Sequence, residues 1–329
     1  MKCISNKSVF LLIVTMYACL LLGCGRVEYS VAYPLEEITT TYLAETLIQE
    51  QYLFSFASNL CVVSDDILID TLDMSELAAI GLFDLSKQEV LYAENVNTIL
   101  FPASLTKVMT AIIVLKHGDL DAIIEVKEPI VFNESGVVTS NIQEGDRLTV
   151  EQALHLLLIS SSNDAAVILA REIGGSMEGF CQLMNDEAKS LGATNTNFVN
   201  PHGLHSDNNY TTAYDLYLMF QEALTYSKFL EISSMVSYET IGRDIEGVEK
   251  VFTASTTNQY LKGVYEVPED ITILNGKTGT TQKAGRCLII HAKDEGESFY
   301  IGVILNAPDL PVLYGKMSEM LVECSTDIE

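Results

Sequence analysis

The sequence contains no tryptophan and few basic residues for a chain of 329. Only 19 lysines and arginines accompany 45 aspartates and glutamates, which gives a formal net charge of −26 at pH 7. A chain this acidic repels the phosphate backbone of DNA and RNA, so we expect no nucleic-acid partner. The acidic surface is typical of a protein that stays soluble in an external medium, and an anionic substrate would need a local cationic pocket.

The sequence also lacks the patterns of a metal site and of a disulfide framework. Its five histidines have no metal-ligand spacing, so we expect no metal. Three of the seven cysteines fall within the first 24 residues, and no pair of the others has C-x-x-C spacing. Those four permit three full pairings, among which the sequence does not choose. We expect buried free thiols at these positions, which are Cys61, Cys181, Cys287 and Cys324.

The N-terminus has the pattern of an export signal. Lys2 and Lys7 precede an apolar run over Val9–Leu22, which is shorter than the roughly 20 residues of a spanning helix. The Leu-Leu-Gly-Cys sequence that ends at Cys24 resembles a bacterial lipobox. It predicts a lipoprotein-type signal peptide over residues 1–24 and lipidation of Cys24 at the outer face of the cytoplasmic membrane. An uncleaved anchor and cleavage without lipid remain open alternatives.

Patterning divides the rest of the chain into a stalk or linker over 25–65, a packed domain over 66–323 and a tail over 324–329. Strands are expected near both ends of the packed domain, and helices between them and at its C-terminal end. The strands are predicted at Leu77–Phe83, Glu89–Ala93, Leu274–Thr281, Cys287–Ala292 and Phe299–Leu305, and the last helix at about Val312–Val322. This order predicts an α+β fold: one antiparallel sheet completed by both ends of the domain, flanked by helices, with an inserted helical subdomain.

Several of the predicted helices have clear start or stop signals. Gly118 ends the first helix, Thr149 with Gln152 forms a capping-box start, and Thr212 with Asp215 caps the last helix before the C-terminal strands. The helices are predicted over Ala103–Lys116, Ala153–Ile159, Asp164–Ile173, Met177–Leu191 and Ala213–Leu224, with an interruption at Ser160–Asn163.

The first of three chemical motifs is Ser104-Leu105-Thr106-Lys107, at the start of a predicted helix. A spacing of three places Ser104 and Lys107 on one helix face, near N–H groups that can bind a developing oxyanion. Lys107 can remove the serine proton only when neutral, so burial and a second cation must lower its pKa. Lys277 is the expected second cation.

The other two motifs are Ser161-Ser162-Asn163, at the helix interruption, and Lys277-Thr278-Gly279, on a predicted strand. A hydroxyl at Ser161 can relay a proton, and the amide of Asn163 can hold a substrate backbone. Lys277 and Thr278 can bind a carboxylate, while glycine lets a substrate strand approach closely. Each motif alone is weak, but in this order they supply the parts for acyl transfer through a covalent serine intermediate.

Over residues 66–323 the chain resembles the D-alanyl-D-alanine carboxypeptidases, low-molecular-mass penicillin-binding proteins of the serine β-lactamase-like superfamily. Stretches around the motifs carry the resemblance: Phe101–Thr110, Asn163–Ala166, Phe198–Leu204, Thr211–Asp215, Lys277–Thr281 and Ala284–Leu288. The resemblance implies removal of the terminal D-alanine from peptidoglycan stem peptides, covalent inhibition by β-lactam antibiotics, and no metal or organic cofactor.

The resemblance also implies roles for individual residues. Ser104 would be the acylated nucleophile, Lys107 its general base and Ser161 the proton relay. The backbone N–H groups of Ser104 and Thr280 would form the oxyanion hole. The substrate would be held by Asn163, Lys277, Thr278, Gly279 and Thr280.

The sequence departs from the family pattern in two ways. No arginine follows Arg286 to help hold the substrate carboxylate, and Lys316 is the expected substitute. The chain ends soon after the catalytic domain, so we expect lipid on Cys24 to replace a C-terminal anchor.

Three other functions are compared with the carboxypeptidase. A β-lactamase is disfavoured because no Glu-x-x-x-Asn lies between Asn163 and Lys277. A DD-endopeptidase and a β-lactam receptor without turnover remain alternatives, although no spanning signalling domain is seen.

Overall fold

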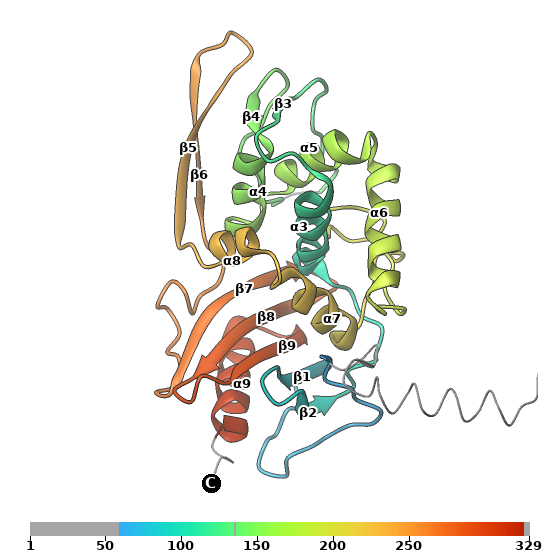
Figure 1. Cartoon of the computed structure of the whole chain (residues 1–329), viewed down its shortest axis with the longest axis vertical. Coiled ribbons are helices and arrows are strands. Elements are labelled where there is room, and N and C mark those ends of the chain that lie inside the picture. The colour runs from blue at the N-terminus through green and yellow to red at the C-terminus, as the bar shows by residue number, and fades with distance from the viewer. Residues whose placement is uncertain (1–58, 135, 326–329) are drawn as a thin grey trace, which may run out of the picture. The chain divides into compact units, whose positions relative to one another are not determined.

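The computed structural model describes residues 59–134 and 136–325 (Figure 1). They lie in one compact unit, which begins at Ala57. The predicted signal peptide, Cys24, most of the linker and the end of the tail lie outside the described residues. Cys61 falls within the predicted linker, yet it is fully buried and its amide donates to the Tyr217 hydroxyl at 2.8 Å. In the described part of the chain, no helix has the length and apolar character to cross a membrane.

A five-stranded antiparallel sheet joins the two ends of this unit. The strand order is β2-β1-β9-β8-β7, with Ala79 of β1 opposite Leu305 of β9. The strands are β1 (Ala79–Asp84), β2 (Glu89–Glu94), β7 (Ile271–Thr281), β8 (Gly285–Asp294) and β9 (Phe299–Ala307). The predicted sheet, completed by both ends of the domain, is therefore confirmed. Within the described residues, β7 is an outer strand with one unpaired edge.

Both faces of the sheet are buried, because alternate residues of its strands enter two separate cores. On β8, Leu288 and Ile290 pack in the cluster that contains Leu313 and Met317 of α9 (Leu310–Ser325). Ile289, between them, belongs to the larger cluster shared with the helices of the inserted subdomain. Figure 1 shows α9 against the sheet and the other helices beyond it.

The inserted subdomain contains the predicted helices. They are α3 (Thr106–His117), α4 (Val150–Ile159), α5 (Asn163–Gly174), α6 (Met177–Ser190) and α7 (Ala213–Ala223). Thr149 and Gln152 form the predicted capping box of α4, and Thr212 accepts from the amide of Asp215 at the start of α7. The first nine residues of α3 are all buried, so this helix is central in the subdomain.

The sequence did not predict a second sheet and one short helix. The sheet has the order β3-β4-β5-β6, formed by β3 (Ile123–Glu125), β4 (Arg147–Thr149), β5 (Ser237–Arg243) and β6 (Glu249–Ser255), and the helix is α8 (Ser227–Ser233). β5 and β6 form a long hairpin with apolar side chains on both faces: Ile241 is 54% and Val251 56% exposed, whereas Phe252 and Ala254 are buried. Because apolar residues lie on both faces, the hairpin lacks the regular apolar alternation that marks a strand.

The described cysteines fit the expectation of free thiols. Cys61, Cys181 and Cys287 are buried and unpaired. The side chain of Cys324 lies outside what the structure describes.

Candidate active site

Ser104 lies in a short 3-10 turn, Ala103–Leu105, which leads into α3. Ala103 has a φ of +47°, a strained conformation for a residue with a side chain. The loop behind the turn passes so close that a Cβ on Gly203 would lie 1.8 Å from the Ala103 carbonyl oxygen. Only glycine fits there, and its φ of +82° also favours glycine. The turn is thus held from behind and leaves Ser104 half-buried.

Lys107 lies one helical turn beyond Ser104 and is fully buried. Its Nζ donates to Ser104 Oγ at 3.0 Å, to Asn163 Oδ1 at 2.9 Å and to the His202 carbonyl oxygen at 2.6 Å. Burial lowers the pKa of Lys107 well below its usual value, Lys277 lowers it further, and the charge of Asp164 opposes this. The amine that contacts the candidate nucleophile is therefore poised to lose its proton.

The turn between α4 and α5 directs its three polar side chains to different partners. Ser161 has a φ of +62°, and its hydroxyl accepts from Lys277 Nζ at 2.9 Å. Ser162 caps α5 by accepting from the amide of Ala165. Asn163 faces Lys107. The sequence alone could not separate a capping role from a chemical one for this motif, and the structure assigns the cap to Ser162.

Strand β7 brings Lys277, Thr278 and Gly279 to the same place. Lys277 is 2% exposed, and burial lowers its pKa to about 7. Besides Ser161, it contacts the Thr278 carbonyl oxygen at 2.9 Å. A Cβ on Gly279 would lie 3.1 Å from the amide nitrogen of Ser104. Glycine therefore lets the strand lie directly against the nucleophile turn.

The structure thus brings all eight predicted residues of the catalytic domain together, although they come from the 3-10 turn, α3, the α4–α5 turn with the start of α5, and β7. They are Ser104, Lys107, Ser161, Asn163, Lys277, Thr278, Gly279 and Thr280. Among the described residues, no group of three or more His, Cys, Asp or Glu side chains is arranged to hold a metal ion.

Sequence reasoning missed three contacts of this site. The His202 carbonyl is the third acceptor of Lys107, and a backbone group leaves no signature in the residue type. Thr257 lies in the segment before β7, and its hydroxyl accepts from that of Thr278 at 2.5 Å. Arg286, on β8, donates to the Thr280 hydroxyl at 3.2 Å, a contact that the pairing of β7 with β8 could have suggested.

Lys316 does not take the place of the missing arginine, so that expectation was wrong. It lies on α9, and its Nζ pairs with Glu319 at 2.8 Å. Its charge also contributes to lowering the pKa of Asp73, although hydrogen bonds from Ser75 are the larger cause. Because α9 packs against β8, β9 and β2, Lys316 lies near the segment before β1 and away from the candidate site.

A hollow of about 630 Å³ continues the site past Thr280. Thr281, Gln282 and Lys283 line one side, and Asn133, Glu134 and His205 are among the residues of the other side.

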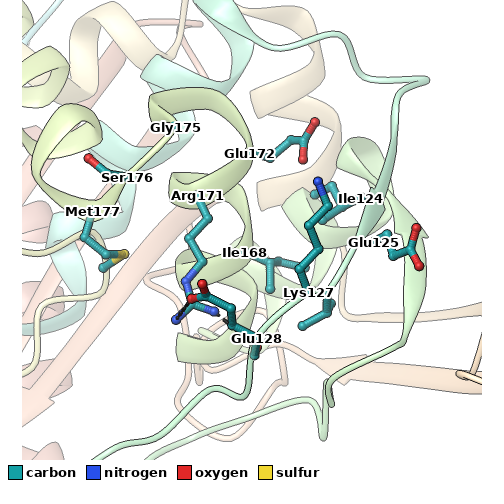
Figure 2. Close-up of a pocket in the computed structure, with 11 residues that line it drawn as sticks. Ile124, Glu125, Lys127, Glu128, Ile168, Arg171, Glu172, Gly175, Ser176 and Met177 are labelled. Atoms are coloured by element: carbon teal, nitrogen blue, oxygen red, sulfur yellow. Dashed lines mark hydrogen bonds and ion pairs between the residues drawn. The ribbon is translucent and has the colours of Figure 1, made fainter.

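Figure 2 shows a different pocket, of about 470 Å³, at the far end of α5. There Arg171 and Glu128 form an ion pair at 3.7 Å. None of the predicted site residues lines this pocket. Its lining residues on and just after α5, from Ile168 to Gly175, lie roughly 8 to 18 Å from Asn163 along the helix axis.

A serine hydroxyl in contact with a buried amine of lowered pKa, beside a second buried amine that contacts the Ser161 hydroxyl, defines a serine acyl-transfer site. Comparisons with known proteins agree with this class. The family model described as D-alanyl-D-alanine carboxypeptidase matches residues 72–309. The chain belongs to the D-alanyl-D-alanine carboxypeptidase family, which is a family of serine peptidases.

Two curated relatives show the extent of the similarity. The D-alanyl-D-alanine carboxypeptidase DacF of Bacillus subtilis (strain 168) is 31% identical over 283 residues, which cover 85% of this chain and 69% of DacF. The D-alanyl-D-alanine endopeptidase of Escherichia coli (strain K12) is 32% identical over 220 residues, or 64% of each protein. The chain thus spans about two thirds of the length of these two relatives.

Solved structures share the fold. A mutant of a Streptomyces DD-transpeptidase superimposes with a TM-score of 0.70 at 24% identity, covering 78% of this chain and 99% of that protein. The mixed fold of antiparallel sheet and inserted helices is therefore that of the DD-transpeptidases, and the fold class predicted from the sequence is confirmed.

Proposed function

We propose that this protein is a serine-type D-Ala-D-Ala carboxypeptidase, which removes the terminal D-alanine from peptidoglycan stem peptides. The observation that carries the proposal is the 3.0 Å contact between Lys107 Nζ and Ser104 Oγ, in a site where both lysines are buried. Family membership supports the same activity. Lys277 and Thr278 supply a cation and a hydroxyl for the carboxylate of the leaving D-alanine.

The reaction begins when neutral Lys107 removes the proton of Ser104 and Oγ attacks the carbonyl carbon of the penultimate D-alanine. The oxyanion accepts hydrogen bonds from the backbone N–H groups of Ser104 and Thr280. As the C–N bond breaks, the proton held by Lys107 passes through the Ser161 hydroxyl to the departing amine. Water then hydrolyses the ester on Ser104, with Lys107 again acting as base.

The substrate lies along the unpaired edge of β7 in this proposal. Its terminal carboxylate is bound by Lys277 and Thr278, with Thr257 orienting the Thr278 hydroxyl. Asn163 holds a substrate amide, and the upstream residues of the peptide extend past Thr280 into the hollow beyond β7. β-Lactam antibiotics acylate Ser104 in the same position.

A DD-endopeptidase acting on crosslinked peptidoglycan is the second candidate function. One relative carries that name, and the hollow beyond Thr280 offers space for a larger donor chain. A β-lactam receptor without turnover would use the same nucleophile, but no particular contact of the site favours it.

We also propose the location and the domain limits predicted from the sequence. The chain is exported through the signal peptide 1–24, held at the outer face of the cytoplasmic membrane by lipid on Cys24, and separated from it by a linker. The catalytic domain begins near residue 66, preceded by the packed segment around Cys61, and ends near residue 323. Mass spectrometry of the membrane-extracted protein tests the anchor: a diacylglyceryl mass on Cys24 supports it, and an unmodified N-terminus at residue 24 or 25 contradicts it.

The activity is tested with a short peptide that ends in D-Ala-D-Ala, compared with the same peptide carrying a C-terminal amide. We expect D-alanine release from the first, and a kcat/KM about 10²-fold lower for release of D-alanine amide from the second, because a buried cation and hydroxyl lose their anionic partner. Equal turnover of both peptides would contradict the carboxylate-binding role of Lys277 and Thr278. Turnover only of crosslinked dimers would favour the endopeptidase.

Replacing Lys277 by methionine is expected to move the acidic limb of the acylation pH profile to higher pH. After burial, Lys277 is the next cause of the lowered pKa of Lys107, so its removal lets Lys107 keep its proton to higher pH. At pH 7 the acylation rate should fall about 10- to 100-fold. Stopped-flow acylation by a chromogenic β-lactam between pH 5 and 10 measures both effects.

Lys293→Met is the matched control for this variant, because Lys293 lies on the neighbouring strand and, among the described residues, its ion pair is with Glu297, at 3.5 Å. Its profile should match that of the unmodified protein. An acidic limb that stays in place in Lys277→Met would contradict the coupling of the two lysines.

A further inference from the structure

Asp164 is a buried carboxylate for which the proposed reaction has no use. It lies in the first turn of α5, next to Asn163, and is 2% exposed. No ion pair to Asp164 within 4 Å forms in the described part of the chain. A buried charge without a cationic partner is costly unless hydrogen bonds compensate it. Its position beside the candidate site therefore requires an explanation.

The hydrogen bonds of Asp164 tie a distant segment to the α4–α5 turn. Its oxygens accept from the amide of Ser140 at 3.0 Å and from that of Ile142 at 2.9 Å. They also accept from the Ala165 amide at 3.0 Å and from the Ser162 hydroxyl. Of these donors, Ser162 belongs to the α4–α5 turn and Ala165 to the first turn of α5, whereas Ser140 and Ile142 belong to the segment 138–142, which we call the anchored segment. Asp164 thus joins the two parts of the chain.

The anchored segment acts in turn on Asn163. The carbonyl oxygen of Val138 accepts from the backbone amide of Asn163 at 2.9 Å and from its side-chain Nδ2 at 2.9 Å. With Nδ2 fixed in this way, Oδ1 of Asn163 is directed at Lys107 Nζ, 2.9 Å away. A continuous series of contacts therefore leads from Asp164 through the anchored segment to the amine that contacts Ser104.

We propose that Asp164 is a positioning residue of this site, whose buried carboxylate fixes the anchored segment and thereby orients Asn163 toward Lys107. The inference rests on the proposed function, because it assigns Asp164 a part in holding the general base. Asp164 itself contacts neither substrate nor nucleophile.

The charge of Asp164 acts on the same amine. Besides Asp164, the charged or titratable residues near the amine of Lys107 are Lys277, from β7, and His202, from the loop behind the nucleophile. Burial, and to a lesser degree Lys107, lower the pKa of His202 to about 3, so its ring is neutral at working pH. Asp164 favours the protonated form of Lys107, against the effects of burial and Lys277. Removing this charge therefore shifts the loss of the Lys107 proton to lower pH.

The test compares Asp164→Asn with Asp164→Glu and with Asp84→Asn, all made in the full chain. Asp84, at the end of β1, is the matched control because it is also buried and its carboxylate accepts from two backbone amides, that of Ser86 at 2.8 Å and that of Lys87 at 2.9 Å. Among the described residues, its hydrogen bonds and its ion pair with Lys87 involve neither the candidate site nor residues 138–142. Each variant is assayed for the rate of Ser104 acylation by a chromogenic β-lactam against pH. Amide hydrogen exchange of residues 138–142 is followed in parallel.

We expect Asp164→Asn to slow acylation about 10- to 100-fold at the optimum pH, since misplacement of a reacting group has effects of this size. Its acidic limb should move to lower pH, opposite to the shift expected for Lys277→Met. The amides of Ser140 and Ile142 should exchange faster. Asp164→Glu should slow acylation but keep the limb, because it retains the charge. Asp84→Asn should leave both the limb and the protection of Ser140 unchanged.

Unchanged exchange at Ser140 and Ile142 in Asp164→Asn would overturn the inference, as would a rate loss with the same size and pH profile in Asp84→Asn. If Asp164→Asn does not fold, a normal acylation rate in Asp164→Glu would overturn it instead. Failure of the proposed function is distinguishable from these results. An unmodified protein that neither releases D-alanine nor is acylated overturns that function, while the exchange data still decide whether Asp164 fixes the anchored segment.

Discussion

Replacing Ser104 by alanine is expected to lower the rate of D-alanine release by about 10⁵-fold or more. The alanine variant keeps the 3-10 turn, since neighbouring Ala103 and Leu105 carry the buried contacts of that turn. What it loses is the only hydroxyl that the structure places 3.0 Å from Lys107 Nζ among the described residues. Without that oxygen no ester can form, and binding alone gives little acceleration.

The release assay uses the D-Ala-D-Ala peptide, with Ser160→Ala as the control variant. Ser160 lies in the α4–α5 turn, but its hydroxyl donates to the Leu156 carbonyl at 2.9 Å, away from the lysines. Its replacement should change kcat/KM less than about threefold, as for a substitution that removes one local hydrogen bond. Turnover in Ser104→Ala above 1% of that of the unmodified protein, roughly 10³-fold more than expected, would place the nucleophile elsewhere.

Replacing Lys107 by methionine is expected to slow acylation by about 10³- to 10⁴-fold, the usual contribution of a general base with its positioning. Methionine fills the buried space of the lysine stem but provides neither a base for Ser104 nor donors for Asn163 and His202. Lys107→Arg should be equally slow, because a guanidinium keeps its proton at all working pH values. Acylation by a chromogenic β-lactam measures both variants.

Lys116→Met serves as the control for the Lys107 variants. Lys116 lies on the same helix, and its ammonium pairs with Glu187 at 2.6 Å, near the opposite end of α3. This variant loses some stability but should acylate at the normal rate. If Lys107→Arg retained activity close to that of the unmodified protein, Lys107 could not be the base.

Much of the fold could be predicted because strong local signals agree with its tertiary structure. Thr149 and Thr212 mark helix starts by a capping geometry that depends on only three or four residues. The inner strands β1, β8 and β9 contain long apolar runs, because both faces of the sheet are buried there. The hairpin of β5 and β6 gave no such signal, since apolar side chains lie on its exposed face as well as on its buried one.

The candidate site was predictable for the opposite reason: its residues are rare in combination, and chemistry requires them together. Ser104, Lys107, Ser161 and Lys277 were found from the sequence. They form two hydrogen-bonded pairs, Lys107 with Ser104 and Lys277 with Ser161, and the charge of Lys277 acts on Lys107. Contacts that depend on the path of the backbone were not found. The carbonyl of His202 is one of these, because any residue type could provide it.

The wrong expectation for Lys316 has the same origin. Nearness in sequence to the last strand suggested a position at the carboxylate end of the site, but α9 lies across the face of the sheet where β8 contributes Leu288 and Ile290. Thr257 supplies a hydroxyl near Thr278 instead, from a loop 21 residues earlier. The order of elements in the sequence does not reveal which loops meet at the open edge of β7.

The central claim is that Ser104 forms a covalent acyl ester. The most direct test is intact-mass analysis of the full chain after incubation with benzylpenicillin, followed by peptide mapping. The account predicts one adduct per chain, on the peptide that contains Ser104, and none in Ser104→Ala. An unmodified mass in the folded protein, or an adduct that persists in Ser104→Ala, would contradict it.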